Sequence, residues 1–469
     1  MARGRKKKGD ALTVKKKFIW DDVKKSELKR IMDVAEEYKG FLNAAKTERE
    51  SVRYLVSMAS ENGFKDISKV KKARKGTRLY ITYRDKVVAL CVVGRRPLEA
   101  GLNIVASHID APRLDLKPYP LHEDKDTGIC LFKTHYYGGI KKYSWGNIPL
   151  AIHGTVVKED GTRIDINIGE DEDDPVFLIP DLAPHLYKNI QAKRKLPDGL
   201  KGEELRVIIS SMKLEEKAKL WVLNHLHERY GIVEEDLVSA EIEIVPAYKA
   251  RDVGLDRSMI GAYGQDDRIC AFTTARAIMD VARPERTCLA LFFDKEEIGS
   301  SGATGADSFL MEHIFSKIFS AVYGEYSHAQ LKEAMENSYC LSADVSTAIN
   351  PVFKDVQELQ NAPALGRGIV VTKYTGHGGK YSASDANPEF VAKLRRVFNR
   401  EKIFWQSGEL GKVDEGGGGT IAKYLARFAM EVLDCGPGLI SMHAPYEISS
   451  KADVYNAVRA YRAFLEKMA

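Results

Sequence analysis

The chain is poor in cysteine, and the few cysteines it has do not form a pattern. Six are scattered over 469 residues with no C-x-x-C spacing. Cys91 lies in the apolar run "VVALCVV" and Cys340 in "SYCLSA". The spacing therefore argues against a disulfide framework and against a zinc knuckle. We interpret the cysteines as buried, reduced thiols of a cytoplasmic protein. They are Cys91, Cys130, Cys270, Cys288, Cys340 and Cys435.

Long apolar runs and a strong net charge are also missing. No stretch approaches the length of a transmembrane helix. Lysine and arginine number 71 against 66 acidic residues, a net charge of +5, so we expect neither a nucleic-acid nor a membrane partner. Basic residues gather only at the N-terminus, in "MARGRKKKGDALTVKKKF". No apolar periodicity accompanies them and no secretory h-region follows, so we interpret this stretch as a solvated, partly disordered tail.

The length predicts two domains, and most of the chain has the pattern of an α/β fold. Helical spacing covers residues 20–62, and strand-like runs then follow over residues 78–108. After residue 265, helical segments alternate with short apolar runs, which indicates a sheet with helices on both faces. In this alternation the stretch 420–436 is interpreted as a helix before the run "LISMHAP".

A different pattern occupies residues 114–250. Short alternating segments such as "SAEIEIVPAY" are broken by Gly, Asp and Pro, which is typical of an all-β region, with one helical segment near residues 214–231. We therefore expect an α/β domain made of residues 1–113 and 251–469, with residues 114–250 inserted as a β-rich domain.

Histidines and carboxylates follow several strand-like runs directly. In open α/β sheets, ligands bind at the carboxyl ends of the strands. Asp266 adds a carboxylate at the start of a helix, where backbone N–H groups favour an anion. The residues at the strand ends are His108, Asp110, Glu296, Glu297, Asp344 and His443.

This donor set has the right size for two divalent metal ions. Imidazole nitrogen and carboxylate oxygen suit zinc, manganese or cobalt. A pair of ions needs a bridging carboxylate and about two further ligands each. Asp266 as the bridge meets that count, with His108 and Asp344 on one ion and Glu297 and His443 on the other.

Two carboxylates remain for other roles. In the H-x-D pattern, Asp110 shares a face with His108 and can orient its imidazole ring. Glu296 adjoins a ligand without being needed as one, so it is the candidate general base. Two adjacent glutamates are ordinarily a solvated surface pair, and a single His or Asp at a strand end is ordinarily a cap. Only the convergence of all these positions favours a metal site.

Five motifs together resemble the aspartyl aminopeptidase / aminopeptidase I family, with its bacterial and archaeal members the most similar. They are "SHIDAPRLDLK", "GQDDRICAF", "DKEEIGSSGATGA", "SADVS" and "LISMHAPYE". The resemblance implies a mixed-sheet zinc-exopeptidase fold and hydrolysis of the N-terminal residue of peptides with two zinc ions. It places the ligands, the base Glu296 and the orienting Asp110 at the positions above.

The resemblance also implies an assembly. The β-rich insert would be a dimerisation domain, and the protein a tetrahedral dodecamer with active sites facing an internal chamber. In "LIPDLAPHL", His185 takes the place of a histidine that reaches a neighbouring subunit's active site, where we prefer a substrate contact to a metal contact. The alternative is an ordinary histidine on the surface of the insert.

Two departures from the family bear on specificity. Asp267 stands where other members often carry Asn. The segment "KYTGHGGKYSASDANPEF" matches the family's substrate-binding segment only in part. Lys373 and Tyr381 are its candidates for contacting substrate, although Lys373 fits a solvated loop equally well. The preferred N-terminal residue is acidic by resemblance, with a broader preference as the alternative.

Two other functions remain as alternatives. The first is membership of the tetrahedral glutamyl-aminopeptidase-like family, which shares the EE-I/V-G and D-x-R patterns. The second is a non-catalytic, self-assembling scaffold that keeps the fold.

Overall fold

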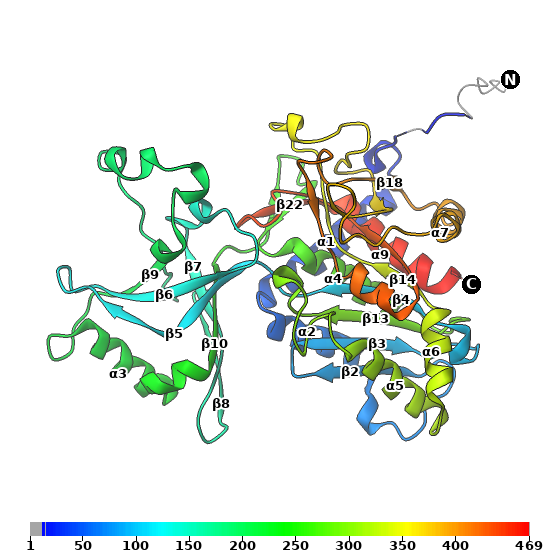
Figure 1. Cartoon of the computed structure of the whole chain (residues 1–469), viewed down its shortest axis with the longest axis horizontal. Coiled ribbons are helices and arrows are strands. Elements are labelled where there is room, and N and C mark those ends of the chain that lie inside the picture. The colour runs from blue at the N-terminus through cyan, green and yellow to red at the C-terminus, as the bar shows by residue number, and fades with distance from the viewer. Residues whose placement is uncertain (1–11, 15, 469) are drawn as a thin grey trace.

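The computed structural model describes residues 12–14 and 16–468, and Figure 1 shows a larger α/β body beside a smaller β-rich one. Most of the basic N-terminal stretch lies outside the described residues. No helix among the described residues is long and apolar enough to cross a membrane. The α-helices there are α1 (Lys25–Ala44), α2 (Glu48–Glu61), α3 (Ala218–Tyr230), α4 (Gln265–Met279), α5 (Leu310–Tyr323), α6 (His328–Glu336), α7 (Pro388–Arg400), α8 (Ala422–Leu425) and α9 (Lys451–Lys467).

A nine-stranded mixed sheet forms the centre of the larger body, in the order β1-β2-β3-β13-β4-β14-β20-β16-β18. Its four middle strands, β13, β4, β14 and β20, run parallel to one another. The strands are β1 (Lys65–Asp66), β2 (Arg78–Tyr83), β3 (Val87–Val92), β4 (Asn103–His108), β13 (Cys288–Phe293), β14 (Tyr339–Ser342), β16 (Ile369–Thr372), β18 (Trp405–Ser407) and β20 (Glu431–Gly436).

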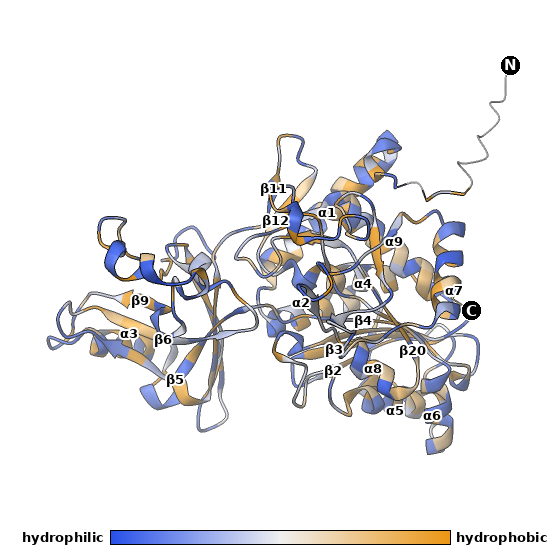
Figure 2. Cartoon of the chain, turned by 45° about the horizontal axis from the view of Figure 1, so that its top comes forward, coloured by the Kyte–Doolittle hydropathy of each residue, from blue (hydrophilic) through white to orange (hydrophobic). Residues whose placement is uncertain are grey.

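Both faces of this sheet are covered, which is why β13 is apolar throughout. Along β13, alternate side chains enter two different cores, because successive residues of a strand point to opposite faces. Cys288, Ala290 and Phe292 join the core that includes α1, α2, α4, α7 and α9. The residues between them join the core of α5, α6 and α8. Figure 2 shows these buried strands as the apolar centre of the body. The expected sheet with helices on both faces is confirmed.

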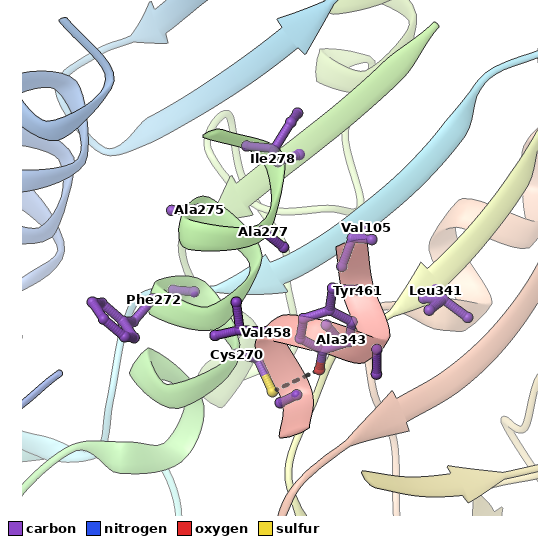
Figure 3. Close-up of a cluster of buried hydrophobic side chains, with 14 of the residues drawn as sticks. Val105, Cys270, Phe272, Ala275, Ala277, Ile278, Leu341, Ala343, Val458 and Tyr461 are labelled. Atoms are coloured by element: carbon purple, nitrogen blue, oxygen red, sulfur yellow. Dashed lines mark hydrogen bonds between the residues drawn. The ribbon is translucent and has the colours of Figure 1, made fainter. Parts of the chain in front are cut away.

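Helix α4, which has Asp266 in its first turn, packs against α9. Small side chains such as Ala275 and Ala277 allow a close approach to the sheet and to α9 (Figure 3). The Tyr461 hydroxyl donates to the Cys435 carbonyl at 2.8 Å and lies 3.5 Å from the Cys270 sulfur. Buried contacts therefore hold α4 at Cys270, one turn beyond Asp266.

The smaller body, which we call the lateral unit, has its own sheet and core. Its strand order is β8-β7-β10-β5-β6-β9, all antiparallel, and Trp145 is fully buried in its core. The expected helix near residues 214–231 is confirmed as α3. The boundaries 114–250 of an inserted domain stay a prediction. The strands are β5 (Arg113–Glu123), β6 (Cys130–Tyr137), β7 (Leu150–Val157), β8 (Arg163–Ile168), β9 (Arg206–Ser210) and β10 (Ala240–Pro246).

A five-stranded sheet, β11-β12-β22-β21-β15, completes the larger body. The expectation that the run before His443 belongs to the same sheet as the others is wrong, since β21 pairs with β15 and β22. The strands are β11 (Arg251–Val253), β12 (Met259–Ala262), β15 (Ser346–Thr347), β21 (Gly438–Ile440) and β22 (Glu447–Ser450).

The expectation of one helix over residues 420–436 is also wrong. The helix α8 stops at Leu425, Ala429 takes a left-handed φ of +61°, and β20 follows. Strand β20 lies between β14 and β16, so pairing in the sheet overrides the local helical pattern.

Candidate metal centre

The main sheet delivers three of the five predicted ligands, His108, Glu297 and Asp344, to one edge. His108 is the last residue of β4 and lies opposite Phe293, the last residue of β13. Glu296 and Glu297 form the turn directly after β13, and Asp344 lies two residues beyond β14. Because these strands are parallel and adjacent, their carboxyl ends meet.

Asp266 lies between the two histidines. Its Oδ1 is 3.3 Å from His108 Nε2, and its Oδ2 is 3.1 Å from His443 Nε2. His443 Nε2 is also 3.3 Å from Glu297 Oε1. One carboxylate thus presents a different oxygen to each histidine, which is the arrangement that a bridging ligand requires.

The carboxylates of this site are crowded and buried. Burial and the neighbouring acids, chiefly Glu297 and Asp110, raise the pKa of Glu296 to about 8, although His108 opposes the shift. Burial likewise raises the pKa of Asp344 well above its ordinary value. For His443, hydrogen bonds with Asp266 and Glu297 outweigh burial and raise its pKa to about 12. If all of them were ionised, the acids of this site would carry more negative charge than His108 and His443 could balance.

The donor set fits divalent cations. Asp266 Oδ1 and Glu297 Oε1 are buried and make no hydrogen bond of good geometry to any described residue. Within the described part of the chain, no lysine or arginine forms an ion pair with Asp266, Asp267, Glu296, Glu297 or Asp344. Oxygen and nitrogen donors also lie within 4.8 Å of one another in three overlapping groups here. Cations from outside the chain would supply the missing charge. The groups are His108–Glu296–Asp344, His108–Asp266–Glu297 and Asp266–Asp267–Asp344.

Asp110 lies where an orienting residue should. Its Oδ1 is 3.2 Å from His108 Nδ1 and accepts the Glu296 backbone N–H at 3.1 Å. Its Oδ2 accepts the Tyr137 hydroxyl at 2.8 Å and the Glu297 backbone N–H at 3.2 Å. One buried carboxylate thereby fixes both a histidine and the turn that carries the two glutamates.

The sequence did not single out Glu447. Its carboxylate accepts the backbone N–H groups of Gln265, Asp266 and His443 at 2.6, 3.2 and 2.8 Å. Burial and the nearby Asp266 raise the pKa of Glu447 to about 8. The one signal was the acidic residue of "HAPYE", which begins the short strand β22.

Asp267 is fully buried beside the site, and its Oδ2 accepts the His108 backbone N–H at 3.4 Å. The peptide bond between Asp266 and Asp267 is cis. Burial raises the pKa of Asp267 well above its ordinary value.

A cavity of about 290 Å³ opens beside these residues. Tyr374, Lys380, Glu409, Lys412 and Asp434 are among its lining residues, together with the two-stranded pair β17 (Gly376–His377) and β19 (Gly417–Gly418). The cavity therefore extends from the candidate metal ligands to a mixed-charge wall.

The three residues expected to contact substrate are not among those lining the cavity. Lys373 pairs with Asp385 at 2.5 Å, and Tyr381 is 75% exposed. His185 is exposed on the lateral unit. Their contacts with substrate stay predictions.

Comparisons with known proteins identify the family. Residues 41–465 match the family model described as "Aminopeptidase I zinc metalloprotease (M18)". The chain is 48% identical to a "Probable M18 family aminopeptidase 1" of Thermotoga maritima over 461 residues, 97% of this chain and 100% of the relative. It is 47% identical to a protein of the same name from Borrelia garinii over 460 residues, with the same coverage.

Solved structures agree as well. The crystal structure of the Thermotoga maritima M18 aminopeptidase has a TM-score of 0.92 at 48% identity, covering 97% of this chain and 100% of that one. A distant structure, that of the S. cerevisiae mApe1 dodecamer, shares the fold at 21% identity, with a TM-score of 0.75 and coverage of 93% and 97%. The family resemblance is thereby confirmed. This chain belongs to the aminopeptidase I (M18) family of zinc metalloproteases, enzymes that remove the N-terminal residue of peptides.

Proposed function

We propose that this aminopeptidase holds two divalent ions, with Asp266 as the bridge. His108 and Asp344 would complete one site, and Glu297 and His443 the other. The observation that carries this proposal is the position of Asp266, with one oxygen toward each histidine at 3.1–3.3 Å. Zinc is the expected ion, with cobalt and manganese as alternatives.

The ions, when bound, would polarise the scissile carbonyl and make a water more acidic. Glu296 would take the proton from that attacking water and pass it to the leaving amine. Asp110 would hold the His108 ring, and Glu447 would hold the backbone of Asp266 and His443.

The substrates would be peptides with a free N-terminus. The cavity wall offers both signs of charge, with Lys380 and Lys412 near Glu409 and Asp434. An acidic preference and a broader one both fit this wall. His185, Lys373 and Tyr381 remain the proposed substrate contacts, with His185 acting on a neighbouring subunit.

We also propose a homo-oligomer built through the lateral unit, up to the tetrahedral dodecamer. Exposed apolar side chains there, including Leu186 at 69% and Leu196 at 68%, support a surface that is covered in an assembly. The yeast mApe1 structure is that of a dodecamer of the yeast protein, which supports the same assembly here. The six cysteines are free and buried, which supports the reducing cytoplasm as the location.

The test is a panel of aminoacyl chromogenic substrates assayed with zinc, cobalt or manganese, alongside metal analysis of the purified protein. We expect about two ions per chain and hydrolysis of substrates with a free amine but not of their N-acetylated forms. Hydrolysis without stoichiometric metal would refute the dimetal site. A protein with neither metal nor activity would instead favour the scaffold alternative.

A further inference from the structure

The end of β6, a strand of the lateral unit, lies against the candidate metal centre. Tyr137 is the last residue of β6, and its side chain is 91% buried. Its hydroxyl donates to Asp110 Oδ2 at 2.8 Å, and Asp110 Oδ1 is 3.2 Å from His108 Nδ1. A residue of the lateral unit therefore supports, through Asp110, the ring of His108.

The next two residues reach the other side of the centre. The Gly139 carbonyl accepts a hydrogen bond from His443 Nδ1 at 2.8 Å. Gly138 has a φ of +72°, and a Cβ there would lie 3.3 Å from Glu297 Cβ. A side chain at residue 138 would be strained in its backbone and crowded against a proposed ligand.

Gly139 thus contacts Nδ1 of His443 directly. Tyr137 supports Nδ1 of His108 through the Asp110 carboxylate. A histidine that binds metal through Nε2 ordinarily donates its Nδ1–H to a carboxylate or carbonyl, which fixes the tautomer and the ring orientation. Both histidines have that partner here, and both partners depend on the same three residues.

Tyr137 is itself held firmly. It pairs in register with Arg113 of β5, and the Arg113 guanidinium lies 3.9 Å from the centre of its ring. Arg113 in turn lies 3.1 Å from Glu243 of the lateral unit and 3.4 Å from Glu48 of the larger body. The hydroxyl therefore has little freedom to leave Asp110.

We propose that Tyr137, Gly138 and Gly139 form a positioning element of the metal centre, through which the lateral unit sets the geometry of both histidines. This inference rests on the proposed ligand set. It gives the lateral unit a role inside its own subunit's active site, in addition to any role in assembly. Tyr137 is a positioning residue, since it acts through Asp110.

The test compares Tyr137→Phe with Tyr136→Phe. Tyr136 is the neighbouring residue of the same strand, is 41% exposed, and lies against Lys142. For Tyr137→Phe, we expect Co²⁺ affinity, measured by competition with a chelator, to fall about 10- to 100-fold. The visible spectrum of bound Co²⁺ should change. The fall in kcat should be larger than any change in KM. Tyr136→Phe should leave all three unchanged.

A purely structural role would lower the melting temperature of the metal-free protein and leave Co²⁺ affinity and spectrum as in the parent. That outcome would overturn the inference. A parent protein that binds no metal would instead refute the proposed function, so the two failures are distinguishable.

A second measurement covers the case in which Tyr137→Phe does not fold. Hydrogen exchange of the unmodified protein should slow at residues 136–140 when metal is added, because both histidines become fixed against this segment. Unchanged exchange there, with slowing only at the ligands themselves, would contradict the proposed element.

Discussion

Two regions of this molecule gather buried carboxylates, and they neutralise them in different ways. Where the lateral unit meets the larger body, the acids face basic side chains of the chain. Lys86 lies 3.1 Å from Glu48 and 2.6 Å from Glu241, and Arg113 contacts Glu48 and Glu243. Beside it, His153 lies 2.8 Å from Glu50 and 3.1 Å from Glu170. We call these residues the junction cluster.

The metal centre has a comparable number of acids but only two histidines among them. The trio Glu48, Glu241 and Glu243 also places oxygens within 4.8 Å of one another, as a metal site would. Lys86, Arg113 and Arg49 form ion pairs with these three acids, whereas no lysine or arginine of the described residues pairs with the acids of the centre. Proximity of carboxylates alone therefore does not indicate a metal; the absence of a basic partner does.

The largest effect should come from the centre. Glu296→Gln keeps the shape of the side chain but removes its ability to accept a proton. We expect kcat to fall on the order of 10²–10⁴-fold, while metal content measured by mass spectrometry stays at the parent level. Activity near that of the parent would show that Glu296 is not the base.

The next effect concerns the junction cluster. Arg113→Met removes a basic partner and leaves Glu48 and Glu243 less balanced, so the free energy of unfolding should fall by about 3–5 kcal/mol in urea. Arg95→Met is the control, because Arg95 and Glu285 form an exposed pair with an expected contribution of about 0–1 kcal/mol. Equal losses of unfolding free energy in the two variants would show that the buried pairs contribute no more than the exposed pair.

Removing metal should separate the two regions. Ligand binding stabilises a fold by about 3–4 kcal/mol when free ligand exceeds its Kd by 100- to 1,000-fold. A chelator should therefore lower the melting temperature of the parent, and of the junction-cluster variant His153→Gln by a similar step. If calorimetry shows no shift in the melting temperature of the parent, the negative charge of the centre is balanced by something other than a metal ion.

The smallest effect is a pH dependence at the junction cluster. Burial lowers the pKa of His153, but hydrogen bonds with Glu170 and Glu50 outweigh it and raise that pKa overall. The stability that His153 contributes is then fully present below its unfolded pKa of about 6.5 and is lost as pH rises through the folded pKa.

His153→Gln should accordingly lower the free energy of unfolding at pH 6 by about 1.5–3 kcal/mol, the range for hydrogen bonds to charged groups. It should have less effect at high pH. Urea unfolding between pH 6 and 9 measures this, with the exposed His227→Gln as control. A constant difference across that range would exclude His153 as the titrating group.

Much of this arrangement could be predicted from the sequence. Apolar runs lead directly to His108, Glu296 and Asp344, so the sequence predicted that each of them lies just after a strand. The carboxyl ends of parallel strands meet at one edge of a sheet, which brings these residues together. The helix start at Asp266 followed from the polar turn before an apolar helix. These features are local, so the pattern of side chains was enough.

Features that depend on contacts distant in sequence were not predictable. Strand β21 has the same local pattern as the others, and only its pairing with β15 and β22 places it in another sheet. Ser441 and His443 both have left-handed φ values, +61° and +64°. The residue types alone do not predict this conformation. Tyr137 looked like an ordinary strand residue, since its partner Asp110 is 27 positions away.

The order of the ligands along the chain has a consequence for biosynthesis. His108 leaves the ribosome before the lateral unit is made, and His443 only just before the final helix. At about 5–20 residues per second, the interval between them is on the order of tens of seconds. A nascent chain therefore carries an unfinished set of donors until His443 has been made. An ion captured in full geometry would mark a chain translated at least as far as His443.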